Sequence, residues 1–241
     1  MAALIHADLR RIVRKKGFWI LQIFLFLFQA VDVIRALGEN NETVVRISQS
    51  SFNGIYLLLT TIFVYLSVFG DDIRSNVPPS IIGMGMTKGK FLRAKILDCV
   101  LLMGIFYALI LGVRAFLFSY MEISISARQM RLLIIYGVFT AIRGLCCIAA
   151  AVLAQQVLGS SAVGILVLVV TTILLGNILR GLQTLYHIGI YDYLPDGLVE
   201  GTINAVSAGN LPLEIVPLIG VYLLGVSWAA CRVFERKELE L

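Results

Sequence analysis

Few residues in this chain have the types and spacing that catalysis needs. The only two histidines, His6 and His187, are far apart in the sequence. We expect them on opposite sides of a membrane, which excludes a histidine-based metal cluster and disfavours a histidine-assisted nucleophile. The segment Gly159-Ser160-Ser161 lacks the second glycine of a nucleophile elbow. The sequence therefore predicts neither an enzyme nor a metal site.

A nucleotide site is not predicted either. A phosphate-binding loop around Gly89-Lys90 would need a glycine where Met84 stands and a serine or threonine where Phe91 stands. No other glycine-rich segment has the required spacing. We therefore expect this chain to have no nucleotide site of its own and to bind no cofactor.

One charged residue stands out because of its depth in an apolar run. Arg143 lies about eleven residues into the run from Leu132 to Gln155, near the bilayer centre at a rise of ~1.5 Å per residue. An arginine there costs at least ~2.5 kcal/mol, so it must face protein or water. Asp98 and Asn177 are candidate partners, and the three residues form a candidate transport pathway. Hydrogen bonding that only joins helices is the alternative role. Asp32, Asp98 and Arg114 lie nearer the ends of their runs, where we expect them to snorkel or cap.

The composition defines the surroundings of these residues. The chain has 241 residues, of which 59% are hydrophobic and 15% are charged, and its mean hydropathy is +0.90. A soluble domain carries about 25% charged residues, so the sequence predicts an integral membrane protein. The net charge is +5, and the cations cluster at the ends of apolar runs. This distribution is typical of membrane insertion and not of nucleic-acid binding.

Six apolar runs each have about the 20 residues that a membrane-spanning helix needs. We therefore predict an all-α membrane protein with a single transmembrane domain over residues 1–241. The runs are Gly17–Leu37, Gly54–Gly70, Ile96–Tyr120, Leu132–Gln155, Ala162–Leu182 and Leu213–Phe234.

Three further segments complete the predicted architecture. Residues 1–16 combine helically spaced apolar residues with five cations, which predicts an amphipathic helix on the membrane surface. Residues 71–95 form a polar break between spans two and three. Residues 181–212 are too apolar for a loop and too rich in Gly and Pro for a span. We predict that they form short helices dipping into the outer leaflet.

The cations predict the orientation. Thirteen of the 20 fall on one side if residues 1–16, residues 71–95 and the C-terminus share that side. The positive-inside rule then places both termini and Lys88 in the cytoplasm of a multi-pass cell-membrane protein, and Asn41 and Asp196 outside.

The polar break predicts a partner. It contains apolar residues, Ile81, Ile82 and Met84, where a solvated loop would have none. Pro79 suits the first turn of a short helix, because proline lacks the N–H that would be unpaired there. Such a cytoplasmic helix cannot turn every apolar side chain to the membrane, so we expect it to dock on another protein.

The end of this break resembles a known family. Thr87, Lys88, Phe91 and Lys95 follow the Ser/Thr–Arg/Lys–x–x–Phe–x–x–x–Lys pattern of ATP-binding-cassette permeases of the type-2 exporter family. Asp71, with Asp72 beside it, ends the second span at a position where that family is similar. The basic N-terminal helix, the six spans and the segment before the last span are also similar in order. The second acid and Pro78-Pro79 depart from the family pattern.

The resemblance implies a permease that carries no ATPase activity itself. Two ATPase subunits and a second permease copy or paralogue would complete the transporter. The docking residues would be Asp71, Asp72, Pro79, Ile81, Ile82, Met84, Lys88, Phe91 and Lys95. Export of, or self-protection against, a peptide, antibiotic or lipid-like substrate is implied. The alternative function is a non-transporting adaptor or sensor subunit that docks a cytoplasmic partner.

Overall fold

The chain folds as a bundle of long helices. The computed structural model describes residues 2–70, 87–187, 189–207 and 215–236, and every regular element among them is helical. Six helices are long and apolar enough to cross a membrane, as predicted from the sequence. They run over Lys16–Arg35, Thr43–Gly70, Lys88–Tyr120, Ala127–Leu158, Ser161–Tyr186 and Pro217–Arg236.

Several of these helices are interrupted, so the elements are more numerous than the spans. The second span combines α3 (Asn41–Ser51), the π-helical turn η1 (Phe52–Tyr56), α4 (Leu57–Tyr65) and a second π-helical turn, η2 (Leu66–Gly70). The fifth span combines α9 (Ser161–Val169), a third π-helical turn, η3 (Val170–Leu175), and α10 (Gly176–Tyr186). The uninterrupted helices are α1 (Ala2–Val13), α2 (Lys16–Arg35), α7 (Lys88–Tyr120), α8 (Ala127–Leu158), α11 (Pro195–Ser207) and α12 (Ile215–Arg236).

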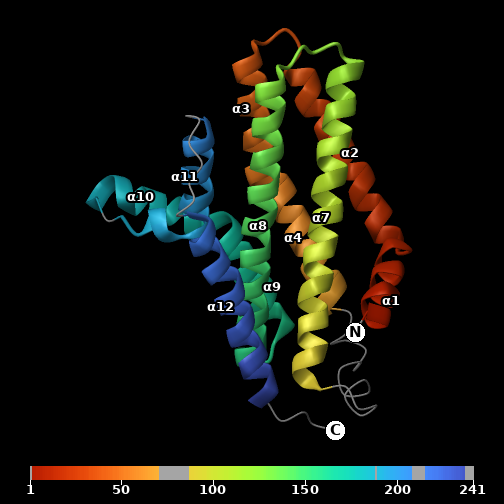
Figure 1. Cartoon of the computed structure of the whole chain (residues 1–241), viewed down its shortest axis with the longest axis vertical. Coiled ribbons are helices and arrows are strands. Elements are labelled where there is room, and N and C mark those ends of the chain that lie inside the picture. The colour runs from red at the N-terminus through yellow and green to blue at the C-terminus, as the bar shows by residue number, and fades with distance from the viewer. Residues whose placement is uncertain (1, 71–86, 188, 208–214, 237–241) are drawn as a thin grey trace.

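Helix α8 is the centre of the bundle. It packs against α4, α7, α9, α11 and α12. In Figure 1 the long helices α7 and α8 stand side by side, with α1 and α2 on the far side of α7 and α12 beside α8. The amphipathic helix α10 projects sideways from the bundle and has no buried side chain.

Local signals in the sequence fix where these helices begin and end. The Asn40 side chain accepts a hydrogen bond of 2.9 Å from the Thr43 N–H and so caps α3. Ser126 and Gln129 cap the start of α8 by bonding to each other's backbone N–H groups. Gly159 ends α8 with φ 72°, a left-handed conformation that glycine adopts without strain. Because α7 ends at Tyr120 and the Ser126 cap starts α8, a short turn joins these two longest helices.

Close packing around α8 depends on small residues. A Cβ atom on Gly144 would lie 2.7 Å from Cγ2 of Thr61 on α4 and 2.5 Å from Cε of Met103 on α7. Such distances are too short for real contacts, so only glycine permits this approach. Gly144 thus lets three helices pack tightly, as small residues do where membrane helices meet.

Two predictions about single charges near span ends were wrong. Asp32 and Arg114 do not snorkel or cap; they form a buried ion pair in which Arg114 Nη2 lies 3.1 Å from Asp32 Oδ2. Tyr56 donates a hydrogen bond of 2.8 Å to the same carboxylate oxygen. Three separate spans meet at this cluster. The position of a residue relative to the end of its own span does not indicate which residues of other spans it contacts.

The N-terminal helix is bound to the bundle by a second buried pair. Lys95 Nζ on α7 lies 2.6 Å from Asp8 Oδ2 on α1, and the Lys95 side chain is 1% exposed. Ile12 of α1 is also fully buried. Helix α1 therefore packs on α7 along one face, while the side chains of His6, Arg10 and Arg14 remain exposed.

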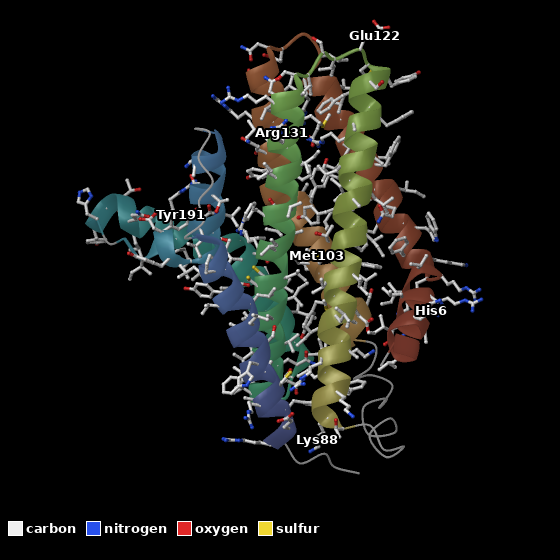
Figure 2. All side chains as sticks on the ribbon, viewed as in Figure 1. His6, Lys88, Met103, Glu122, Arg131 and Tyr191 are labelled. Atoms are coloured by element: carbon white, nitrogen blue, oxygen red, sulfur yellow. The ribbon has the colours of Figure 1, made fainter. Side chains whose placement is uncertain are left out.

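Some boundaries differ from the prediction. The second span begins near Thr43 and not at Gly54, because a helix over Asn41–Ser51 precedes the kink at Gly54. The third begins at Lys88 and not at Ile96. Figure 2 shows Lys88 and Glu122 at opposite ends of α7.

Candidate functional site

A cavity of about 710 Å³ opens between several parts of the fold. Its wall is formed by α3 with η1 and the start of α4, by α8, by η3 with α10, by η4 (Tyr191–Tyr193) and by α11. Charged side chains from four helices line it. They are Arg46, Arg143, Arg180, Asp196 and Glu200. This concentration of charge beside membrane-length helices makes the cavity the candidate functional site.

The first ion pair of the cavity joins α8 to α11. Arg143 lies near the middle of α8 and pairs with the carboxylate of Asp196, and the two side chains are only 9% and 12% exposed. The Arg143 Nη2 also donates a hydrogen bond of 3.1 Å to the Thr172 carbonyl oxygen. Arg143 thus connects α8 both to α11 and to η3.

Local structure explains why Asp196 can reach so deep. Pro195 is the first residue of α11, where its missing N–H costs nothing, and Asp196 lies in the first turn, where the helix dipole favours an acid. A Cβ atom on Gly176 would collide with the Asp196 carboxylate, and one on Gly197 would collide with the Tyr191 backbone. Two glycines therefore make the space that brings Asp196 to Arg143.

A second ion pair joins α10 to α11 at the more open side of the cavity. Arg180 pairs with Glu200, and these side chains are 55% and 43% exposed. The Tyr191 hydroxyl donates a hydrogen bond of 2.9 Å to Glu200 Oε2, and the Arg180 guanidinium lies 5.4 Å from the centre of the Tyr191 ring. Burial, together with the carboxylate, raises the pKa of Tyr191, so its hydroxyl remains protonated at neutral pH.

Two of the three π-helical turns contribute to the cavity wall. Gly54 in η1 has φ −95° and ψ −106°, outside the helical region, and it lines the cavity together with Ile55. Thr172 and Ile173 line it from η3. Irregular backbone at membrane depth is tolerated where it faces protein or a cavity. Single π turns are also frequent at functional sites.

The structure brings together two of the three predicted pathway residues. Arg143 and Asn177 both line the cavity, and Asn177 donates a hydrogen bond of 2.8 Å to the Ile173 carbonyl oxygen. Asp98 is fully buried on α7 and is not part of the cavity wall. Neither residue forms the ion pair of Arg143, and that part of the prediction was wrong.

The sequence reasoning missed most of the cavity's charged residues. Asp196 was expected outside the membrane, and Glu200, Arg180, Tyr191 and Arg46 were not proposed for any site. One signal was available: Asp196 and Glu200 are four residues apart, which places them on one face of a helix. A face with two acids, in a segment otherwise apolar, indicates nearby cations.

The predicted docking residues are only partly described. Asp71, Asp72, Pro79, Ile81, Ile82 and Met84 lie outside the described residues. Lys88 is half-buried at the start of α7. Phe91 and Lys95 are buried, Phe91 beside Phe234 of α12 at a ring distance of 6.4 Å and Lys95 in its pair with Asp8. Those two side chains pack inside the subunit.

The fold and the cavity define a multi-pass α-helical membrane protein. The cavity offers guanidinium, carboxylate, amide and hydroxyl groups beside apolar side chains, a combination that suits the binding of a small molecule. Comparisons with protein-family models, with curated proteins and with solved structures find no match.

Proposed function

We propose that this chain is the permease subunit of an ATP-driven exporter resembling the type-2 ATP-binding-cassette family. The observation that carries the proposal is the charged cavity, in which two ion pairs connect α11 to α8 and α10. Charges at such a depth are costly, and in membrane proteins they mark substrate and ion pathways. A binding cavity beside membrane-length helices is what a transported molecule requires.

The ion pairs would also provide the moving part. Asp196 and Glu200 are carried by one short helix, α11, whereas Arg143 and Arg180 are carried by two other helices. Release of both pairs would free α11 from α8 and α10 together. In our proposal, ATP-driven tilting of the spans shifts the balance between the paired and released arrangements, and the cavity opens alternately.

The energy would come from partners. Two ATPase subunits, with ATP and Mg²⁺, would act on a permease pair made of two copies or of this chain and a paralogue. They would dock at residues 71–95, on the cytoplasmic side. Arginines and lysines of α1, the start of α7 and the end of α12 favour that side for both termini.

Reconstitution tests the proposal. The chain is purified with any ATPase that binds it and placed in liposomes, and the release of candidate lipid-like and antibiotic substrates is measured with and without ATP. We expect ATP-dependent movement that Arg143→Leu abolishes. Binding of an ATPase without any movement would favour the alternative, a non-transporting adaptor.

Docking is tested separately with Ile82→Asp together with Met84→Asp. Burying a charge in an apolar groove is unfavourable, so the double variant should lose the ATPase in a pull-down while still inserting in the membrane. Arg128→Asp, at the turn between α7 and α8, is the control. Undiminished pull-down by the double variant would place the docking surface elsewhere, with the basic N-terminal helix as the next candidate.

A further inference from the structure

The charges that line the cavity do not balance. Arg143 pairs with Asp196 and Arg180 pairs with Glu200, whereas Arg46 of α3 forms no ion pair with any residue in the described part of the chain. Three guanidinium groups therefore face two carboxylates. The guanidinium group of Arg46 is exposed and belongs to the cavity wall, so it is available to a ligand.

Guanidinium groups favour one kind of ligand. Their N–H donors match carboxylate and phosphate oxygens in pairs, and the bond is strengthened by charge. Gln49 and Asn204 line the same cavity and can donate further hydrogen bonds to such oxygens. The polar part of the cavity thus suits an anionic group.

Part of the wall is apolar. Ile55, Leu58 and Ile173 line the cavity together with the polar groups. Ile173 is also 40% exposed, and Leu174 and Ile178, which follow it in η3 and α10, are 47% and 56% exposed. The cavity is therefore bordered by an apolar outer surface of the kind that faces lipid.

From the polar and the apolar residues of the wall we infer that the cavity binds an amphiphile with an anionic headgroup. Arg46 contacts the headgroup, and Ile55, Leu58 and Ile173 lie beside the start of the tail. The headgroup is a phosphate or a carboxylate, of a membrane lipid or of another single-chain amphiphile. This inference rests on the proposed function, for which it names the class of substrate.

Binding is measured on the full chain in a neutral maltoside detergent, without ATP or ATPase. The probe is dodecyl phosphate, followed by isothermal titration calorimetry. Dodecylphosphocholine, with the same tail and no net charge, and inorganic phosphate, with no tail, are the comparison ligands. We expect dodecyl phosphate to bind at least tenfold more tightly than either.

Variants locate the site. Arg46→Gln should weaken dodecyl phosphate binding by roughly tenfold, as expected for loss of one charge-assisted contact. Arg131→Gln removes an exposed arginine of α8 that is outside the cavity wall and should leave binding unchanged. Ser50→Trp places a large side chain in the cavity without changing the charge of the cavity wall, and it should abolish dodecyl phosphate binding. Thermal melting curves confirm that each variant is folded.

Four results would overturn the inference. They are no binding of dodecyl phosphate, unchanged binding by both Arg46→Gln and Ser50→Trp, equal binding of dodecylphosphocholine, and equal binding of inorganic phosphate. The assay needs no transport. Binding without ATP-dependent movement would refute the proposed function alone, and movement of a cationic substrate without dodecyl phosphate binding would refute this inference alone.

Discussion

Two charge clusters in the described part of the chain lie on either side of η1 and differ in their access to solvent. On one side, Phe52 and Tyr56 of η1 enclose the pair between Asp32 and Arg114, whose side chains are 11% and 2% exposed. On the other side, Gly54 and Ile55 of η1 face the cavity with its two ion pairs. An arginine–aspartate pair is therefore enclosed by aromatic rings on one side of η1, and a pair of the same kind lies in a cavity wall on the other.

The enclosed cluster has the features of a structural joint. Arg114 lies 5.1 Å from the ring centre of Phe52 and 5.7 Å from that of Tyr56, so aromatic faces replace water around it. It connects three spans and is not part of the wall of the charged cavity. The cavity cluster instead connects short elements that approach the bundle from one side (Figure 1). Burial alone shows that a charged side chain is costly to place, whereas a charged side chain in a cavity wall is also accessible to a ligand.

Removal of the cation from the enclosed cluster should have the largest effect on stability. Arg114→Leu leaves the Asp32 carboxylate buried without its cation, which typically costs about 3–5 kcal/mol. We expect loss of folded protein, measured by yield in detergent and by thermal melting. Rescue by the added change Asp32→Asn would support the pairing, and a fully stable single variant would contradict it.

The matching change in the cavity should separate activity from folding. Arg143→Leu leaves Asp196 beside a cavity that water can enter, so we expect a stability loss of only about 1–2 kcal/mol. In the proposed complex with an ATPase, ATP hydrolysis should fall by about tenfold or more. Equal losses of yield and activity would instead assign Arg143 a structural role like that of Arg114.

A third change displaces a carboxylate without removing any charge. Gly176→Ala forces the Asp196 carboxylate away from its position, and strain of this kind costs about 1–3 kcal/mol. Gly181→Ala, on the same helix, meets nothing within 4 Å and is the control. We expect lower ATP hydrolysis for Gly176→Ala only. Equal activity of the two variants would show that the contact between α10 and α11 is not needed.

The smallest effects come from removal of one hydroxyl from each cluster. Tyr56→Phe deletes a buried hydrogen bond to Asp32 and should lower stability by about 1–2 kcal/mol. Tyr191→Phe deletes a bond to Glu200 at the open side of the cavity, where water replaces it, and should change stability by less than about 0.5 kcal/mol. Thermal melting under identical conditions compares them, and a reversed order would contradict the distinction between the clusters.

The sequence alone determined the membrane architecture. Apolar runs of about 20 residues have few stable alternatives to spanning helices, because lipid offers no hydrogen bonds to the backbone. The six spans predicted in this way are present, and so is the helix within residues 1–16. The cost of a central arginine also identified Arg143 as a residue that needs polar surroundings.

Only the tertiary structure decided which charges meet. Arg143 pairs with Asp196 from a segment expected outside, and Asp32 pairs with Arg114 from another span. Hydropathy fixes which stretches cross the bilayer, but it does not fix the rotation of each helix or the course of residues 181–212. Those depend on packing at Gly144, Gly176 and Gly197 and on the π-helical turns, which shift every following side chain around the helix axis. Contacts of this kind join residues distant in the chain, and no local pattern encodes them.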